Sequence, residues 1–329
     1  MAMTGPDHLD ADRLSAPGGE PVLVVDAARW RRPRAPVQAV VIGVDEAGDL
    51  PPVVADDFDL LLTGAIAPSR PWVSLARAPG ADMLATAVRQ SPLAATIAAQ
   101  VLRMTARLSF PDALAVESFA YSTLLGGSEF ARWRMGRNPG DTLRTPDDPL
   151  QIEREGDRVI VTLNDPVSRN AMSAPMRDAL YEALANILDD PSRPAVTLCG
   201  AGRCFSSGGA LDEFGSARDL AEAHAVRTLH SCARALDAIG ERGAVRLHGA
   251  CIGSGIEIAA AAHRRIAAPD AWFQLPELGM GLIPGAGGTI SIARAIGRHR
   301  TLWMLLSGRR IKAPTALEWG LVHHVEEAA

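Results

Sequence analysis

Short apolar runs separated by turn residues mark the beginning of the chain. The runs share a high content of Val and Leu, and they lie at Val22–Val25, Ala39–Val44, Phe58–Leu62 and Trp72–Leu75. Runs of this length suit buried strands. Residues 1–20 are polar and rich in Gly and Pro, so we expect them to be disordered or loosely ordered.

A helical period replaces the short runs after residue 90. Ser91 and Pro92 suit the N-cap and first position of a helix, and apolar side chains then recur every three or four residues as far as Leu102. Further helical patterns follow from Pro111 to about Leu125 and from Glu129 to Met135. The pattern predicts a small α/β segment over residues 21–140 that ends in helices at 91–139.

The second half of the chain alternates strand and helix patterns. Residues 151–163 predict a hairpin around Gly156-Asp157. The later strands are expected at 195–198 and 244–247, and the helices at 173–188, 220–238 and 256–263. Such alternation implies parallel pairing with right-handed crossovers. We therefore expect an α/β domain at residues 150–329, which a proline-rich linker joins to the first segment.

Composition narrows the function classes. A net charge of −5 opposes a nucleic-acid partner, because binding to phosphate backbones needs concentrated positive charge. No apolar stretch approaches the roughly 18 residues of a membrane span, so we expect a soluble cytoplasmic protein without a membrane partner. The four cysteines form no C-x-x-C pair, which indicates neither a disulfide framework nor a metal site.

Three glycine-containing loops carry the candidate chemistry. Each taken singly is as well explained by tight packing between a strand and a helix. Their order and content, following the segment Asp165–Met172, resemble the crotonase (enoyl-CoA hydratase/isomerase) superfamily. The similar motifs are G-x-G-x-x-F-x-x-G at Gly200–Gly208, G-x-x-x-G-G-G-x-E at Gly249–Glu257 and F-x-x-P-E-x-x-x-G-x-x-P-x-x-G-G at Phe273–Gly288.

The resemblance implies a fold and a reaction class. The fold would be a crotonase-like spiral of ββα units, preceded by a smaller N-terminal α/β segment ending in lid-like helices. The substrate would be an acyl-CoA thioester of fatty acid metabolism that reacts through an enolate. No cofactor is expected apart from the coenzyme A of the substrate, and the chain would form a homo-oligomer, a trimer or hexamer.

An enolate needs donors for the charge that develops on the thioester oxygen, and two backbone N–H groups supply such donors in an oxyanion hole. By the resemblance, these donors are the amides of Ser207 and Ser254. The resemblance also places substrate-binding residues at Arg169, Asn170, Ala171, Gly208, Gly253 and Gly285.

Two carboxylates, Glu257 and Glu277, stand where enoyl-CoA hydratases carry their catalytic glutamates. Hydration of a double bond needs one group to deprotonate water and another to protonate the alpha carbon, and a carboxylate pair can do both. By the resemblance, Glu257 activates water and Glu277 protonates C2. Retention of both glutamates favours an enoyl-CoA hydratase.

Two alternatives stay open. In a 3,2-enoyl-CoA isomerase, one glutamate would shuttle the proton and the other would be a bystander. A catalytically idle homologue would bind an acyl-CoA or a partner protein. Ala210 and His263, which stand where the family commonly has Asp, favour the idle homologue.

Crotonases ordinarily continue in helices beyond the segment that Gly320–Val322 resembles. Ser91–Ala94, Ala113–Glu117 and Phe130–Pro139 resemble motifs of those helices. One hypothesis is therefore that the helical lid precedes the core, by permutation or as a worn second copy of the fold. The other is an unrelated helical docking domain. The displaced lid would cover the apolar side chains of Trp303, Leu306 and Trp319 in the core. Some of its arginines would meet the phosphates of coenzyme A; the candidates are Arg103, Arg107, Arg132, Arg134 and Arg137.

Overall fold

The hairpin expected at residues 151–163 forms one edge of a six-stranded sheet in the computed structural model, which describes residues 12–31, 37–76, 80–136 and 146–326. Neighbouring strands pair in parallel except β5 with β6, in the order β13-β10-β8-β7-β6-β5. The strands are β5 (Leu150–Glu155), β6 (Arg158–Leu163), β7 (Ala195–Gly200), β8 (Gly243–Leu247), β10 (Arg264–Ala267) and β13 (His324–Val325).

A second sheet, seven α-helices and three short 3₁₀ helices complete the described part of this half. The sheet has the order β12-β11-β9, with β9 at Ala250–Ile252, β11 at Trp272–Gln274 and β12 at Ile311–Lys312. The helices are α6 (Ala174–Asp189), α7 (Leu220–Leu229), α8 (Cys232–Ile239), α9 (Ser254–Ala259), α10 (Gly288–Ile296), α11 (Arg298–Ser307) and α12 (Ala313–Trp319). No helix in the described ranges is both long enough and apolar enough to cross a lipid bilayer.

The four apolar runs near the N-terminus form a parallel sheet in chain order. Its strands are β1 (Val22–Asp26), β2 (Val40–Asp45), β3 (Leu60–Thr63) and β4 (Val73–Ser74). Successive side chains of a strand point to opposite faces. Leu60 and Leu62 accordingly join the main core, while Leu61 packs in a small cluster with Phe58 and Trp72. Burial of both faces explains why Leu60, Leu61 and Leu62 of β3 are all apolar.

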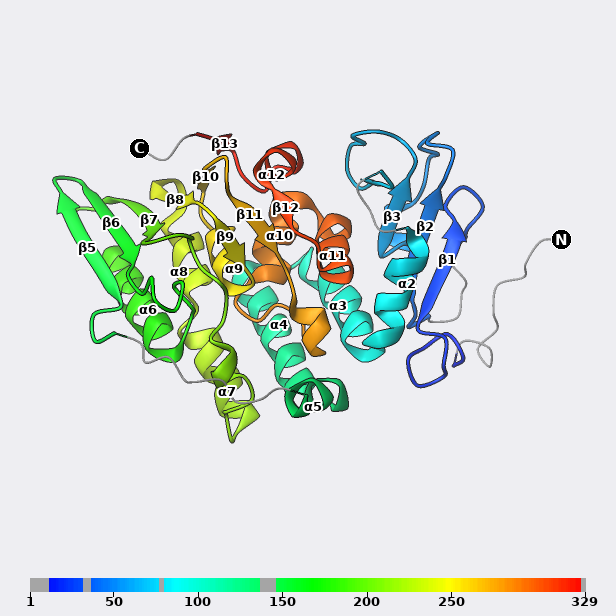
Figure 1. Cartoon of the computed structure of the whole chain (residues 1–329), viewed down its shortest axis with the longest axis horizontal. Helices are drawn as coiled ribbons and strands as arrows, with labels where there is room; N and C mark the ends of the chain where they lie inside the picture. Colours follow the sequence, from blue (N-terminus) through cyan, green and yellow to red (C-terminus); the bar gives the residue numbers. More distant parts are fainter. Residues whose placement is uncertain (1–11, 32–36, 77–79, 137–145, 327–329) are drawn as a thin grey trace.

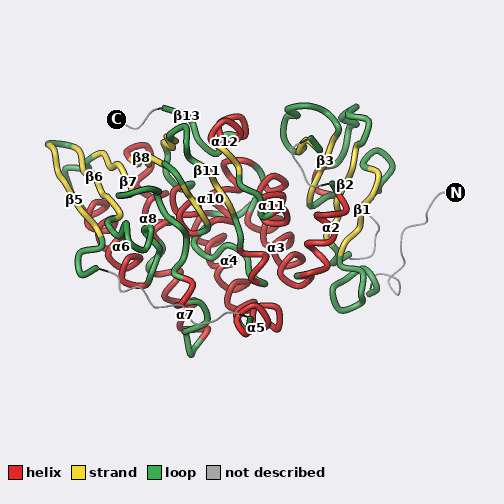
Figure 2. The backbone as a smooth tube through the Cα atoms, in the orientation of Figure 1, coloured by secondary structure: helices red, strands yellow, loops and turns green. Residues whose placement is uncertain are grey.

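Helices α3 (Pro92–Thr105), α4 (Phe110–Leu125) and α5 (Ser128–Met135) follow the predicted pattern, and α2 (Ala81–Gln90), which the sequence analysis did not predict, precedes them. In Figure 1, α2 and α3 lie between the blue N-terminal strands and the orange helices α10 and α11. Figure 2 shows the two larger sheets at opposite ends of the molecule, with most helices between them. One continuous apolar core therefore runs through both halves.

The three apolar side chains that the lid was expected to cover are buried. Trp303, Leu306 and Trp319 are 3%, 4% and 3% exposed. This surface is thus buried. Arg70, which lies outside the predicted lid, donates to the Trp319 carbonyl oxygen at 3.1 Å, and helices α2 and α3 lie beside α11. Whether they correspond to the C-terminal helices of the crotonases stays a prediction, and the end of the proposed lid motif, at residues 137–139, lies outside the described residues.

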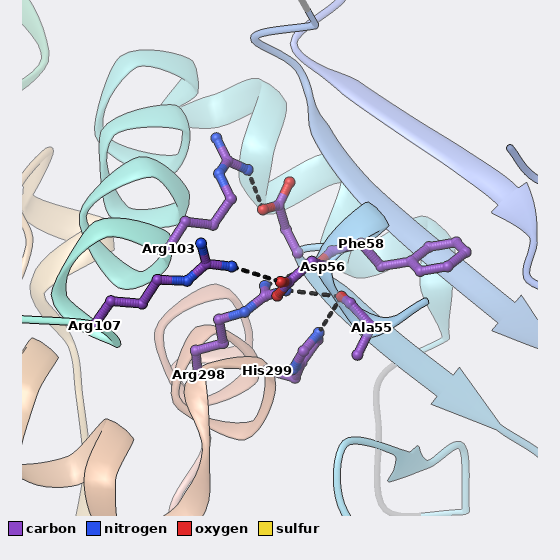
Figure 3. Close-up of polar contacts among 8 residues, drawn as sticks. Ala55, Asp56, Phe58, Arg103, Arg107, Arg298 and His299 are labelled. Carbon is purple, nitrogen blue, oxygen red and sulfur yellow. Dashed lines mark hydrogen bonds and ion pairs between the residues drawn. The ribbon is translucent and has the colours of Figure 1, made fainter. Parts of the chain in front are cut away.

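A polar network joins the N-terminal strands to the core (Figure 3). The Arg298 guanidinium donates to the carbonyl oxygens of Phe58 and Ala55, each at 2.7 Å, and contacts the Asp56 carboxylate. His299 Nε2 lies 3.1 Å from the Ala55 oxygen. Burial, together with the Arg298 charge, lowers the pKa of His299 to about 4, so this imidazole is neutral at pH 7.

Two arginines expected to meet coenzyme A lie in this network instead. Arg103 pairs with Asp59 and Arg107 with Asp56. Arg134 donates to the Gly215 carbonyl at 2.7 Å, at the edge of the cavity described below. Arg137 lies outside the described residues. The phosphate-binding role therefore stays a prediction for Arg132, Arg134 and Arg137.

The prediction of one helix at residues 220–238 was wrong. Residues 220–238 form two helices instead of one, because the Ser231 hydroxyl accepts a hydrogen bond from the Arg234 amide and begins α8 there. Ser91 is the N-cap residue of α3, as predicted, but its side chain makes no capping hydrogen bond. The Glu129 carboxylate of α5 instead accepts from the amides of Leu93 and Ala94, at 2.8 and 3.0 Å.

Candidate functional site

A cavity of about 810 Å³ lies between the two halves of the chain. The core contributes the loops at 207–219 and 252–254, and the N-terminal half contributes Tyr121 and Leu125 of α4. Its volume falls in the range of small-molecule sites. The glycine-rich loops singled out in the sequence thus open into one space, together with a helix far from them in the chain.

Glu257 and Glu277 both line this cavity. Glu257 lies in the first turn of α9, and Glu277 begins a 3₁₀ helix at Glu277–Met280. The two side chains converge on Gly253: a Cβ there would lie 2.7 Å from Glu277 Oε1 and 3.9 Å from Glu257 Oε1. Gly253 also has φ +47°, so glycine suits both the backbone and the space that the carboxylates need.

The two carboxylates have different hydrogen bonds. Glu257 Oε2 accepts from the amides of Ala286 and Gly288, at 2.7 and 3.2 Å. Glu277 Oε2 is buried and has no hydrogen-bond partner among the described residues. Glu257 is therefore better prepared to carry a negative charge, and Glu277 to carry a proton.

Burial raises the pKa of both carboxyl groups. The pKa of Glu277 rises to about 8, through desolvation and through the nearby Glu117 carboxylate. The pKa of Glu257 rises well above its ordinary value, through desolvation and the charges of Glu277 and Glu117, although the two amide bonds oppose the rise. The assignment of the negative charge to Glu257 therefore rests on its hydrogen bonds. Shifts of this kind are typical of acid–base sites.

The two amides predicted as oxyanion donors belong to adjacent loops. Ser206 and Cys251 form a parallel β-bridge, so Ser207 and Ser254 both reach the cavity. Ser254 is the first residue of α9, where helical N–H groups have no partner within the helix. The Ser207 amide donates to the Arg169 carbonyl at 2.9 Å, so binding an oxyanion would require it to share its hydrogen. The oxyanion hole stays a prediction.

The six predicted substrate-binding residues divide into two groups. Gly208, Gly253 and Gly285 line the cavity, and the ring of Tyr121 packs so closely on Gly285 that a Cβ there would lie 2.7 Å from it. Arg169, Asn170 and Ala171 are not among the described residues that line it. Their contact with substrate stays a prediction.

The Asn170 side chain holds the neighbouring loop together. Asn170 is fully buried, and its Nδ2 donates to the carbonyl oxygens of Ala201, Cys204 and Phe205. Its Oδ1 accepts from the Asp165 amide at 2.9 Å. These four bonds account for the amide side chain, which therefore shapes the loop carrying Ser207.

Sequence reasoning missed Tyr121 and Arg227 as cavity residues. The Arg227 guanidinium carbon lies 4.9 Å from the centre of the Tyr121 ring, and Nε donates to the Ser118 hydroxyl at 3.1 Å. These contacts fix α4 against α7 at the cavity wall. The similarity of residues 113–117 to a lid motif pointed to the helix but not to these side chains.

Known proteins resemble the second half of the chain. The enoyl-CoA hydratase/isomerase family model matches residues 154–328. The putative enoyl-CoA hydratase/isomerase YngF of Bacillus subtilis is 36% identical over 167 residues, which cover 50% of this chain and 64% of that protein. The peroxisomal bifunctional enzyme of Danio rerio is 36% identical over 169 residues, covering 51% of this chain and 22% of its own.

Solved structures agree with these sequences. The enoyl-CoA hydratase of Mycobacterium smegmatis has a TM-score of 0.51 and 29% identity, covering 55% of this chain and 71% of that one. The enoyl-CoA hydratase of Thermoplasma volcanium has a TM-score of 0.50 and 29% identity, covering 55% and 72%. The chain spans less than two thirds of YngF and of the Danio rerio enzyme. Its folded core is nevertheless that of a crotonase, and the chain belongs to the enoyl-CoA hydratase/isomerase family.

Proposed function

We propose that the chain is an enoyl-CoA hydratase, which adds water reversibly to a trans-2-enoyl-CoA. The observation that carries the proposal is the pair of buried glutamates, Glu257 and Glu277, which meet at Gly253 in one cavity with different hydrogen bonds. Several relatives are named as enoyl-CoA hydratases, which supports the same reaction class.

The proposed step uses both carboxyl groups. Glu257 takes a proton from water as the oxygen attacks C3 of the enoyl group, so that an O–H bond breaks and a C–O bond forms. The electrons of the double bond move to the thioester oxygen as an enolate, which accepts hydrogen bonds from the amides of Ser207 and Ser254. Each such donor contributes a few kcal/mol to barrier lowering. Protonated Glu277 then delivers its proton to C2.

A 3,2-enoyl-CoA isomerase is the second candidate. Two amides bind Glu257 Oε2 and hold that carboxylate in place. Glu277 Oε2 is buried without a hydrogen-bond partner among the described residues, which favours Glu277 as the group that transfers the proton in an isomerase. A single shuttle through Glu277 would move a proton between C2 and C4 without adding water. The same cavity would serve, because only the position of the double bond differs.

Kinetic assays of the full chain with crotonyl-CoA and with a 3-enoyl-CoA separate these reactions. The hydratase proposal expects loss of the conjugated double bond of crotonyl-CoA and formation of the 3-hydroxyacyl thioester. Conversion of the 3-enoyl-CoA alone would establish the isomerase. Acyl-CoA binding without turnover of either substrate would indicate the idle homologue.

We also propose that the chain forms a homo-oligomer, a trimer or hexamer. Family membership supports this proposal. Light scattering of the full chain tests it, and a monomer at micromolar concentration would contradict it.

A further inference from the structure

Glu117 is a buried carboxylate outside the glycine-rich loops. It lies on α4 and is fully buried. Its Oε1 accepts from the Gly287 amide at 2.7 Å, and its Oε2 accepts from the Thr289 amide and hydroxyl at 2.8 and 2.7 Å. The N-terminal half of the chain thus reaches the beginning of α10 with a carboxylate that receives three hydrogen bonds.

The same stretch of backbone holds the catalytic candidate Glu257. Its Oε2 accepts from the amides of Ala286 and Gly288, whereas Glu117 takes those of Gly287 and Thr289. Four consecutive amides therefore alternate between two carboxylates. Gly287, with φ +103°, belongs to this stretch, and a Cβ there would lie 2.8 Å from the Ala233 Cβ. Because the donors are covalently linked, a shift toward or away from one carboxylate moves the donors of the other.

We propose that Glu117 is a positioning residue, which holds residues 286–289 so that their amides orient the Glu257 carboxylate for reaction. The inference rests on the proposed acid–base role of Glu257. It implies that the N-terminal half, which supplies Glu117, contributes to the geometry of the site. Glu117 is not one of the described residues that line the cavity. It therefore acts on Glu257 through the backbone of residues 286–289 and through its charge.

The pH dependence of the reaction distinguishes a positioning role of Glu117 from simple packing, because Glu117, Glu257 and Glu277 influence one another's charge. Burial raises the pKa of Glu117 to about 7, and its charge raises the pKa of both Glu257 and Glu277. Tyr121 of α4 and Arg227 of α7 face the same cluster. Replacing Glu117 by Gln removes one negative charge and should lower the pKa values of the remaining carboxyl groups.

The test is steady-state hydration of crotonyl-CoA by the full chain and by Glu117→Gln, from about pH 5.5 to about pH 9. We expect kcat to fall by on the order of 10²-fold with KM changed less than about twofold, and the limb of kcat/KM set by the glutamates to move to lower pH. Thr289→Val, which removes only the hydroxyl bond to Glu117, should give a smaller loss of kcat with the same unchanged KM.

Ser109→Ala is the matched control. The Ser109 hydroxyl caps α4 by accepting from the Asp112 amide. Among the described residues this hydroxyl bonds only to Asp112, so its loss should lower stability without moving the pH limb. A Glu117→Gln enzyme with the kcat and pH profile of Ser109→Ala would overturn the inference. If Glu117→Gln does not fold, Thr289→Val decides alone, and full activity of that variant would count against the inference.

A double-mutant cycle separates this inference from the proposed reaction. Urea unfolding of the wild type, Glu117→Gln, Glu257→Gln and the double variant should give non-additive losses of stability, because the two carboxylates share one backbone segment. Non-additive losses in a chain that hydrates no enoyl-CoA would refute the proposed hydratase reaction but support the structural link between Glu117 and Glu257. Additive losses in an active hydratase would refute the link.

Discussion

Glu277 carries a buried oxygen without a hydrogen-bond partner among the described residues, and its pKa rises to about 8. The folded protein therefore binds more protons than the unfolded chain between the ordinary pKa of a glutamate and that value. Stability from this group is fully present below about pH 4.5 and is lost as the pH rises toward 8. At about 1.4 kcal/mol per pKa unit, protonation of Glu277 contributes at most several kcal/mol to the free energy of unfolding.

Glu277→Gln should consequently be more stable than the wild type at alkaline pH. Its amide resembles the protonated carboxyl group and does not titrate. We expect the free energy of unfolding of the variant, minus that of the wild type, to grow from about pH 5.5 to about pH 8.5 in urea titrations. A constant difference over this range would show that Glu277 ionises normally in the folded protein.

At the scale of single residues, the sequence indicated the glutamate pair but not every role. Glu257 and Glu277 stand in recognisable loops, and the fold brings both loops into one cavity. Asn170 matched a family segment equally well, yet its side chain is used by four hydrogen bonds within the protein. Tyr121 lies more than a hundred residues before the glutamates, so no local spacing connects it with them.

Helix α3 shows why element boundaries were harder to predict. Ser91 and Pro92 marked its start correctly, but its amides are capped by Glu129 of α5, which lies 36 residues after Leu93. A local pattern cannot reveal a cap supplied by another helix. The strands, by contrast, were predicted from short apolar runs, because burial on both faces leaves a mark in the sequence itself.

Glu129→Ala should destabilise the protein by about 1–2 kcal/mol, because it leaves two amides at the beginning of α3 without their acceptor. Asp112→Ala on α4 is the control, since Asp112 bonds only to the exposed Ser109 among the described residues. Thermal or urea unfolding measures both. Equal, small losses for the two variants would contradict the capping role of Glu129.

At the scale of the molecule, the N-terminal strands and the family core share one apolar interior. The two halves also meet in the network of Figure 3, where Arg298 is 11% exposed and Arg107 is 79% exposed. This continuity predicts that the halves unfold together. The sequence suggested separate segments because its apolar runs and its linker gave no information on how one segment packs on the other.

Arg298→Met should lower the free energy of unfolding by about 2–4 kcal/mol, because the carbonyl oxygens of Ala55 and Phe58 lose charged donors. Arg107→Met, at the exposed pair with Asp56, should cost less than about 1 kcal/mol. Tryptophan fluorescence and circular dichroism should report a single transition in both variants. Two separate transitions in the wild type would show that the halves are independent.

The proposed hydration depends on two glutamates, so the decisive measurement is the rate of crotonyl-CoA hydration by Glu257→Gln and Glu277→Gln. Each variant should lose on the order of 10²–10⁴-fold in kcat while binding the unreactive butyryl-CoA with an affinity within a few-fold of the wild type, because the glutamates act on the reacting atoms and not on the coenzyme. A Glu277→Gln enzyme that hydrated crotonyl-CoA at the wild-type rate would contradict the account.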